Sequence, residues 1–328
     1  MAASTFALRR GVAFSALVLG SLTVTGRAIE PGLPSKTSIL SASLRAVGAK
    51  NPDQGFRNPD YLAIKFLGPR ERTIVKDFPM DALDLDYQRA VERLSPQDRG
   101  SVSTMLIRTK HLDGALDDAL RDGVRQVIIL GAGFDSRGYR YKDRLRGVRF
   151  LEVDYGPTQE HKKLRVRAAL GKVPAEVRYV PMDFTKDDLL TQLRKGGYSE
   201  KDQSLYIWEG VTMYLPETAI RSTLRFIREH SAPGSKVVFD YTLATDPRLN
   251  NAATRFAKWG EPWLFGFPGT SAVDSLRDAG LTSLADASMV DLASRYAKRQ
   301  DGTWAVPEFS DDQKSRRICI AQVPGTSP

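Results

Sequence analysis

The sequence predicts an α/β protein built on a mostly parallel sheet with helices on both faces. Short apolar runs rich in β-branched and aromatic residues alternate with longer amphipathic segments. The runs are almost continuously apolar, as expected for strands buried on both faces. They occupy residues 126–131, 148–155, 177–184, 204–210 and 236–243. Such alternation of strands and helices is typical of a doubly wound sheet.

Residues 1–30 differ from the rest of the chain and are expected to be a leader. They hold Arg9 and Arg10, then an apolar run at 11–26, and no acidic residue before Glu30. A charged start, an apolar core and a small-residue exit are typical of a secretory signal, and the lack of acids equally suits an organelle transit segment. The apolar run is short for a membrane span of about 20 residues, and a retained anchor is a third alternative.

Two further segments precede the alternating pattern. Residues 31–60 are rich in Pro, Gly, Asn and Asp, which indicates a linker and an irregular lead-in. Residues 60–122 carry apolar side chains at helical spacing. We therefore expect a linker and an N-terminal helical cap over residues 31–122, followed by an α/β domain over residues 123–328.

Helix and strand signals continue through the second half of the chain. Pro157 and Pro216 suit the first turns of helices that follow the second and fourth strand-like runs. After the fifth run, the pattern predicts a helix at 271–280, a weaker strand at 281–288 and a closing strand at 315–324.

Composition excludes several classes of protein. The single cysteine, Cys319, excludes a disulfide framework, and no Cys/His cluster has zinc spacing, so we expect no metal. The net charge is +9, but 48 basic residues are interleaved with 39 acidic ones rather than gathered in runs. This spread favours a solvated basic surface over a nucleic-acid groove.

The first strand-like run ends in a glycine loop, "GAGFDSRG". Gly131 and Gly133 allow a tight turn and close approach of the backbone to a ligand. Ser136 stands where a third glycine would complete the dinucleotide-binding motif, and the next glycine is Gly138. The loop alone is therefore compatible with a nucleotide ligand or with an ordinary strand–helix turn.

Acids at the ends of later strands narrow the choice of ligand. Asp154 ends the second strand, where a carboxylate can accept both hydroxyls of an adenosine ribose. Asp183 and Phe184 follow the third strand, and an acid beside an aromatic ring suits the adenine of S-adenosylmethionine (SAM). Together with Asp135 and Glu209, these acids predict a pocket that favours a sulfonium cation over a diphosphate.

Four segments in this order resemble the leucine carboxyl methyltransferase-like family of SAM-dependent O-methyltransferases: "ILGAGFDSRGYR", "FLEVDY", "MDF" and "WEGVTMYL". The resemblance runs from about Arg108 to the end of the chain, and more loosely from Asn58. It implies a Rossmann-like class I methyltransferase fold with a seven-stranded, mostly parallel sheet and an N-terminal helical extension. Residues 123–328 would then be the SAM-binding methyltransferase domain.

The resemblance also implies roles for individual residues. Arg108 matches the helical arginine that binds the methionine carboxylate of SAM, and Gly131 and Gly133 match the loop beneath that moiety. The ribose acid is Asp154 and the adenine pair is Asp183 and Phe184, whereas Glu209 lies near the methionine end and the acceptor. The segment 260–268 resembles an acceptor-side segment of the family.

The methyl acceptor and any general base stay open. A carboxylate is already a nucleophile at neutral pH, whereas a phenol usually needs a base. His111 shares a helix face with Arg108, but a packing histidine is commoner, so no catalytic residue is assigned. Trp259, Trp263, Phe265 and Phe267 suit either an acceptor pocket or core packing, and Tyr139, Tyr214 and Tyr241 are unranked candidates near strand ends.

The predicted function is transfer of a methyl group from SAM to a carboxylate or hydroxyl of a small molecule, with a protein C-terminal carboxylate as a second acceptor. An NAD(P)-dependent oxidoreductase and a SAM-binding protein without catalysis are the alternatives, and a nucleic-acid partner is disfavoured. Because the family's members are cytosolic, a cytoplasmic location is expected, with membrane anchoring, an organelle or export through the leader as alternatives.

Overall fold

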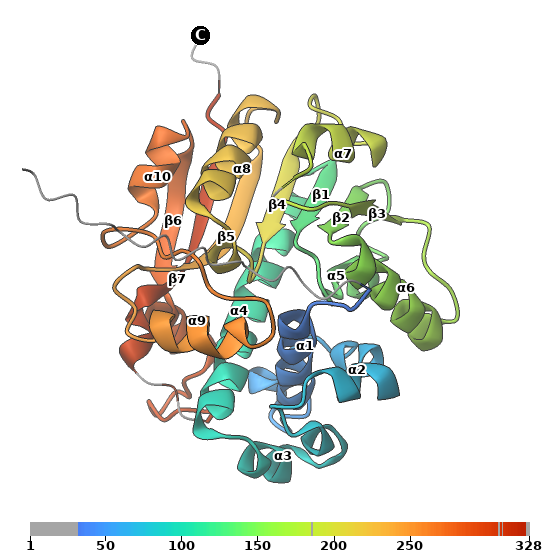
Figure 1. Cartoon of the computed structure of the whole chain (residues 1–328). Coiled ribbons are helices and arrows are strands. Elements are labelled where there is room, and N and C mark those ends of the chain that lie inside the picture. The colour runs from blue at the N-terminus through green and yellow to red at the C-terminus, as the bar shows by residue number, and fades with distance from the viewer. Residues whose placement is uncertain (1–31, 185, 308, 310, 326–328) are drawn as a thin grey trace, which may run out of the picture.

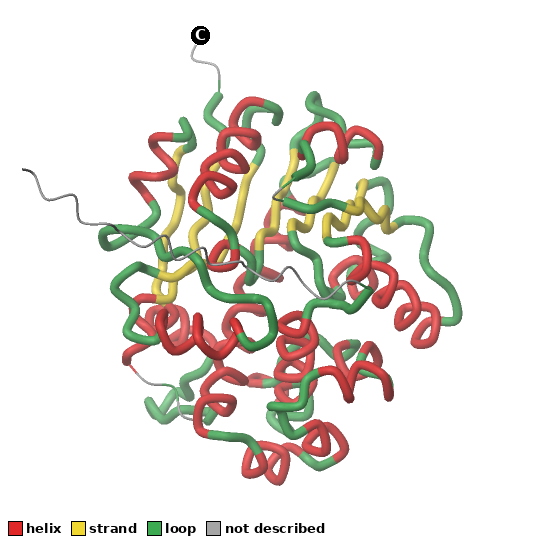
Figure 2. The backbone as a smooth tube through the Cα atoms, in the orientation of Figure 1, coloured by secondary structure: helices red, strands yellow, loops and turns green. Residues whose placement is uncertain are grey.

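The structure is a computed structural model that describes residues 32–184, 186–307, 309 and 311–325. The leader predicted at residues 1–30 lies outside the described residues. A seven-stranded sheet runs through the described part of the chain (Figures 1 and 2). Its strands are β1 (Gln126–Leu130), β2 (Arg149–Asp154), β3 (Val177–Pro181), β4 (Ser204–Trp208), β5 (Lys236–Thr242), β6 (Thr282–Ser288) and β7 (Arg316–Gln322).

The strand order is β3-β2-β1-β4-β5-β7-β6. The first five strands pair in parallel, and β7 lies between β5 and β6, antiparallel to both. The order reverses between β1 and β4, so a crevice forms where the loops after these two strands diverge, as is usual for ligand sites in such sheets. The predicted α/β fold with a mostly parallel sheet is confirmed.

Helices cover both faces of the sheet because its strands are apolar on both faces. One core joins β-strand residues to helices α4 and α11, and the other joins them to α7, α8 and α10. The helices are α1 (Lys36–Gly48), α2 (Pro69–Ile74), α3 (Tyr87–Arg93), α4 (Pro96–Arg121), α5 (Arg137–Arg140), α6 (Gly156–Leu170), α7 (Leu189–Lys195), α8 (Glu217–Glu229), α9 (Leu249–Ala257), α10 (Val273–Asp278) and α11 (Met289–Tyr296).

A group of helices lies beyond the carboxyl ends of the parallel strands. Figure 1 shows α1, α2 and α3 gathered there, with α9 beside them and α4 running from this group along the sheet. The long helix α4 contacts both α1 and the central strands. It therefore links the N-terminal helices to the edge of the sheet at which a ligand would bind.

The structure differs from the sequence-based expectation at α1, which was expected to be part of an irregular lead-in. Ser35 caps this helix by accepting a hydrogen bond from the Ser38 amide. Ile39, Leu44 and Val47 are at most 3% exposed, so the helix is held by core contacts. In the sequence, Pro- and Gly-rich stretches flank this helix on both sides, so its short amphipathic pattern was not recognised as a helix.

In the part of the chain that the structure describes, no helix is long and apolar enough to cross a membrane.

Candidate active site and cofactor site

The glycine loop after β1 leaves no room for side chains at two positions. Gly131 and Gly133 have φ values of 69° and 45°, in the left-handed region that favours glycine. A Cβ on Gly131 would lie 2.3 Å from Val211 Cγ2, and a Cβ on Gly133 would lie 2.9 Å from Ser38 Cβ. The loop is therefore pressed between the segment after β4 and the start of α1.

Asp154 at the end of β2 lies directly beside this loop. Its carboxylate accepts hydrogen bonds from the Gly133 amide and, at 2.6 Å, from the Tyr155 amide. Burial raises the pKa of Asp154 to about 6, although these two amide bonds oppose the shift. Each oxygen keeps a lone pair beyond the bond it accepts, so the carboxylate can still receive hydroxyl donors from a ligand.

Asp183 and Phe184 lie one strand further along the same edge. The Met182 amide donates to the Asp154 carbonyl oxygen at 2.8 Å, which brings the segment after β3 next to Asp154. The Asp183 side chain is 28% exposed and lies 2.9 Å from the Lys186 ammonium. Phe184 is partly buried against the core on the α7 side. This pair is close to Asp154 but does not line the pocket beneath α1.

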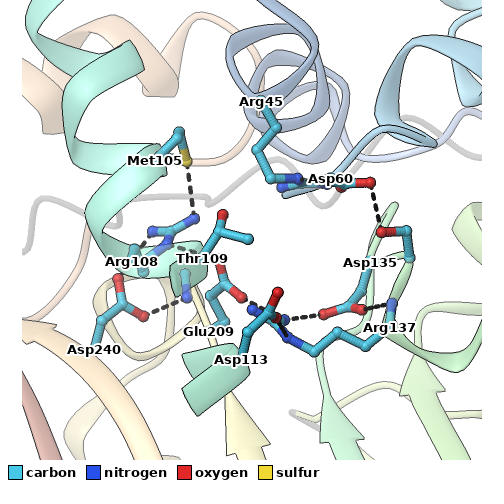
Figure 3. A network of polar contacts seen from close by, with 12 residues as sticks. Arg45, Asp60, Met105, Arg108, Thr109, Asp113, Asp135, Arg137, Glu209 and Asp240 are labelled. Atoms are coloured by element: carbon cyan, nitrogen blue, oxygen red, sulfur yellow. Dashed lines mark hydrogen bonds and ion pairs between the residues drawn. The ribbon is translucent and has the colours of Figure 1, made fainter. Parts of the chain in front are cut away.

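Arg108 reaches the site from the middle of α4, as Figure 3 shows. Its Nε lies 2.7 Å from Glu209 Oε1, and its Nη1 lies 2.9 Å from Asp240 Oδ2. A further N–H donates to Met105 Sδ at 3.3 Å. Since a guanidinium carries five N–H donors, two stay available to a ligand after these contacts with the described residues.

Glu209 follows β4 and is shared by two arginines. Oε1 contacts Arg108, whereas Oε2 accepts from Arg137 Nη1 at 2.7 Å. Burial alone would raise the pKa of Glu209, but Arg137 and Arg108 together hold it far below the usual range. The Glu209 carboxylate is therefore ionised at every pH at which the protein would be studied.

The prediction of an acid-rimmed pocket was incomplete, because arginines neutralise part of the rim. Arg137 also pairs with Asp135 and with Asp113, the latter at 2.8 Å. Of the four acids at strand ends, Asp154 is partly buried and has no arginine partner among the described residues. The local preference for a cation thus rests on fewer free carboxylates than the sequence suggested.

An extended ion-pair network joins this rim to α1, and sequence reasoning missed it. Arg45 of α1 binds Asp60 at 2.8 Å and the Phe134 carbonyl oxygen at 2.9 Å. Arg140 binds both oxygens of Asp113, at 2.7 and 3.0 Å. The only sequence signals were the two arginines of "DSRGYR" and the aspartate of "NPDY", and neither residue type nor spacing indicates burial.

A pocket opens between the glycine loop, α1 and the network. Of the residues predicted from the sequence, Gly131, Gly133 and Glu209 line it, whereas Arg108, Asp154, Asp183 and Phe184 lie around it. The lining consists of Ser38, Ser41, Arg45, Asp60, Thr109, Ile129, Gly131, Ala132, Gly133, Phe134, Asp135, Ser136, Arg137, Arg140 and Glu209.

Glu261 ties the start of α1 across this pocket. Its carboxylate accepts from the Lys36 amide at 2.6 Å and from the Ser35 hydroxyl at 2.7 Å. It also accepts from the Thr37 amide and hydroxyl, at 3.3 and 2.5 Å. The segment 35–38 is thus held over the glycine loop by a residue from the far half of the chain, within the predicted acceptor-side segment.

Tyr214 lies close to Glu261 and Thr37. Its ring packs edge-on against Trp263, with centroids 6.3 Å apart. Burial raises the pKa of Tyr214 to about 12, and the nearby charge of Glu261 adds to the rise. The hydroxyl therefore stays protonated at neutral pH, so it can donate a hydrogen bond but cannot act as a base.

The other aromatic and histidine candidates lie elsewhere. Tyr139 bonds to the Tyr179 hydroxyl at 2.6 Å, and Tyr241 donates to Asp286 at 2.7 Å. His111 faces the Tyr296 hydroxyl at 3.4 Å and does not line the pocket. Trp259 and Phe267 are 8% and 1% exposed and belong to the cores, whereas Trp263 and Phe265 are only partly buried.

This sheet order, with a glycine loop and a partly buried acid at the ends of its first two strands, defines a Rossmann-like methyltransferase fold. The profile of the leucine carboxyl methyltransferase family matches residues 38–228, more than half of the chain. The chain therefore belongs to the leucine carboxyl methyltransferase family, and it is a SAM-dependent methyltransferase.

Proteins of similar sequence carry names that support this assignment. A Bacillus subtilis protein is 27% identical over 263 residues, which cover 75% of this chain and 86% of that protein. A Mycolicibacterium smegmatis protein is 33% identical over 230 residues, which cover 66% of this chain and 70% of that protein. Both proteins carry names that assign them, by inference, to the SAM-dependent methyltransferases.

Solved structures show the same fold. A DUF574 family protein of Streptomyces avermitilis has a TM-score of 0.53 at 14% identity, over 86% of this chain and 97% of that chain. A Thermobifida fusca protein described as an expected methyltransferase also has a TM-score of 0.53 at 14% identity, over 90% of this chain and 97% of that chain. At this identity the likeness supports the fold alone.

The residues present fit SAM. The glycine loop lies directly beside Asp154, whose carboxylate accepts a hydrogen bond from the Gly133 amide. Asp154 keeps lone pairs for two ribose hydroxyls, and Arg108 keeps two N–H donors for a carboxylate. These groups are the acceptors and donors that the ribose and the amino-acid end of SAM require.

Proposed function

We propose that the enzyme is an O-methyltransferase that methylates a carboxylate or hydroxyl of a small molecule. The observation that carries the proposal is the arrangement around Glu209, where Arg108 and the pocket beneath α1 meet near Tyr214 and Trp263. When bound, SAM supplies an electrophilic methyl group. The protein's part is to align an acceptor oxygen with it and to exclude water.

The residues that would hold the cofactor follow from their chemistry. Asp154 would accept the ribose hydroxyls, and Asp183 with Phe184 would contact the adenine. Arg108 would bind the methionine carboxylate, with its guanidinium held in place by Glu209 and Asp240 at 2.7 and 2.9 Å. A fixed guanidinium loses less conformational entropy on binding than a free one, which favours tight binding.

Oxygen rather than nitrogen as the acceptor is supported by the absence of a histidine base from the described lining of the pocket. None of the three histidines lines the pocket, and the Tyr214 phenol keeps its proton at neutral pH. A carboxylate acceptor is ionised at neutral pH and needs no base. A carboxylate therefore fits the site better than a hydroxyl, and a protein C-terminal carboxylate is a second candidate of the same chemistry.

Titration calorimetry with SAM, S-adenosylhomocysteine (SAH) and NADH tests the cofactor assignment, using protein that lacks residues 1–30. We expect SAM and SAH to bind and NADH not to bind. Binding of NADH without either SAM compound would refute the proposal and favour an oxidoreductase.

The chemistry of the acceptor is tested with SAM that carries a radioactive methyl group. A library of small carboxylic acids and phenols is incubated with the enzyme, and products are then treated with mild base. A methyl ester releases volatile labelled methanol, whereas a methyl ether keeps its label, so the two acceptor types are distinguished. SAM binding without any SAH release on either class of acceptor would instead indicate a binding protein that lacks catalysis.

A further inference from the structure

An arginine at the start of β7 faces the same side of the sheet as the site. Arg316 lies directly opposite Thr242, the last residue of β5, and Ile318 lies opposite Asp240. Directly paired residues share a face of the sheet. Since Asp240 pairs with Arg108 of α4, the Arg316 side chain also lies on the α4 side, at the edge beyond which the ligand pocket opens.

Among the residues that the structure describes, the Arg316 guanidinium has no ion-pair partner. Within the described ranges it makes no ion pair and no hydrogen bond, although it is partly buried. Loss of water, together with the nearby charges of Arg248 and Arg108, lowers the pKa of Arg316 to about 10. An arginine held among other arginines and away from water is a costly arrangement.

The carboxylates that lie nearest to Arg316 are already used. Asp240 binds Arg108 at 2.9 Å and accepts from the Gly210 amide at 2.5 Å. Asp246 binds Arg248 at 2.9 Å. Both carboxylates therefore lower the free-energy cost of burying the Arg316 charge only through longer-range attraction, and neither forms a hydrogen bond or ion pair with Arg316.

A hydroxyl group next to Arg316 also lacks a partner. The Thr242 hydroxyl oxygen is buried and makes no hydrogen bond to any described residue, whereas the Ser315 hydroxyl lies by the Asp246 carboxylate. Thr242 is 1% exposed and stands directly across the strand pair from Arg316. A cation and a hydroxyl donor without acceptors thus lie together, and such donors suit an anion.

We propose that Arg316, with Thr242, forms a subsite for an anionic group of the methyl acceptor. This inference rests on the proposed function. Arg108 is assigned to the only carboxylate of SAM, and the rest of SAM carries no negative charge, so an anion at Arg316 must arrive with the second substrate. The substrate class is therefore an acid, whose anionic group is a carboxylate or a phosphate.

Anion binding to the SAH-saturated enzyme tests the subsite. Benzoate and inorganic phosphate are titrated separately by calorimetry, and the probe that binds identifies the type of anion. Arg316→Gln should weaken its binding roughly 10- to 100-fold, the usual effect of losing a charge-assisted contact, and Arg316→Lys should restore part of it. Thr242→Val, which removes one hydroxyl donor, should weaken binding less.

Arg317→Gln is the matched control. Arg317 is the next residue along β7, but it lies opposite Tyr241 on the other face and pairs with Asp286 at 3.0 Å. Its replacement should leave anion binding unchanged. The melting temperature adds a second control, because Arg316→Gln removes an unpaired charge and should not lower the Tm in the absence of anions.

The outcomes separate this inference from the proposed function. SAH that fails to bind the wild-type enzyme would refute the proposed function. The anion titrations are then run on the free enzyme, where a loss of anion binding in Arg316→Gln would still support the subsite. The inference is overturned if neither probe binds the wild type, or if both proteins bind the probes equally. A fall in Tm of several degrees in Arg316→Gln without anions would show a structural role and would overturn it too.

Discussion

Asp154 carries a carboxyl group that ionises close to the pH of most assays. Burial raises its pKa to about 6, and the only bonds that oppose this rise come from two backbone amides. The ionised form is the better acceptor for ribose hydroxyls. The occupancy of the cofactor site should therefore depend on pH through this one residue.

Asp154→Asn should weaken SAM binding roughly 10- to 100-fold, because a charged acceptor becomes a neutral amide that can accept through only one atom. In the wild type, SAM affinity should fall as the pH drops below about 6, since the carboxyl group then takes up a proton. Calorimetry between pH 5 and 8 measures both effects, and the variant should show a flatter profile.

Asp143→Asn is a suitable control for this test, because the Asp143 side chain is 72% exposed and pairs only with the neighbouring Arg146 among the described residues. Its affinity and its pH profile should match those of the wild type. Equal SAM affinity in Asp154→Asn and the wild type would remove Asp154 from the ribose site.

Residues that follow strands could be predicted from the sequence, whereas their partners could not. Asp154 and Glu209 were identifiable because a strand end fixes where a side chain must lie. Arg137 and Asp113 become neighbours only when α4 packs on the sheet, and their ion pair joins segments 24 residues apart. The charge of the site therefore depends on tertiary contacts that no local pattern encodes.

At the scale of a single element, α1 has an unusual N-terminus. Its first amides and hydroxyls are satisfied by a distant carboxylate, that of Glu261, in addition to the Ser35 cap. Because Ser38 of the same turn lies where a Cβ on Gly133 would be, we expect the attachment of this turn to control access to the glycine loop.

Glu261→Gln should open the start of α1 more often. The amide keeps one acceptor oxygen in place of two and loses the charge that attracts the helix N-terminus. We expect SAH to dissociate roughly 10-fold faster, in line with the loss of one or two charge-assisted hydrogen bonds. Stopped-flow displacement gives the dissociation rate, and hydrogen exchange at residues 35–38 reports the opening.

The comparison for this variant is Glu217→Gln, which removes an exposed ion pair with Arg221 on α8. Its dissociation rate should not change. If exchange at residues 35–38 became faster in Glu261→Gln while SAH dissociation stayed the same, opening of α1 would not limit release.

Strands were predicted more reliably than α1 for a physical reason. A strand buried on both faces needs a continuous apolar run, which is visible locally. Helix α1 buries only part of its surface and owes its position to Glu261 and to the network around Arg45 and Asp60. Its formation therefore depends on residues that are remote in the sequence.

At the scale of the whole molecule, the parallel sheet buries acidic groups that oppose folding when ionised. Glu152 is fully buried, and burial raises its pKa to about 7. The Lys162 ammonium lies 2.7 Å from Glu152 Oε2, but the two are not aligned as a hydrogen bond. Asp154 and Asp135 add like charge and disfavour ionisation further.

The free enzyme should therefore lose stability as the pH rises from 5 to 8. The stabilising contribution of a carboxyl group with a raised pKa is complete below its unfolded pKa and is lost as the pH passes the folded pKa, here about 7 for Glu152 and about 6 for Asp154. The loss should be on the order of 2 kcal/mol. Urea unfolding at each pH measures it.

Glu152→Gln isolates this contribution. His111 acts in the opposite direction, because burial lowers its pKa and its protonation at acid pH opposes folding. The difference between variant and wild type removes that common effect and should shrink as the pH falls. Glu160→Gln, at a side chain that is 70% exposed, should follow the wild type. A constant difference at all pH values would contradict the prediction.

The position of β7 also has a consequence for biosynthesis. β7 lies between β5 and β6 although it follows both in the chain, so β6 cannot join the sheet until residues 316–322 have left the ribosome. Until then, β5 is an edge strand that pairs only with β4 and has buried side chains on both faces. Translation rate and chaperone supply at this late stage should thus govern how much of the enzyme escapes aggregation.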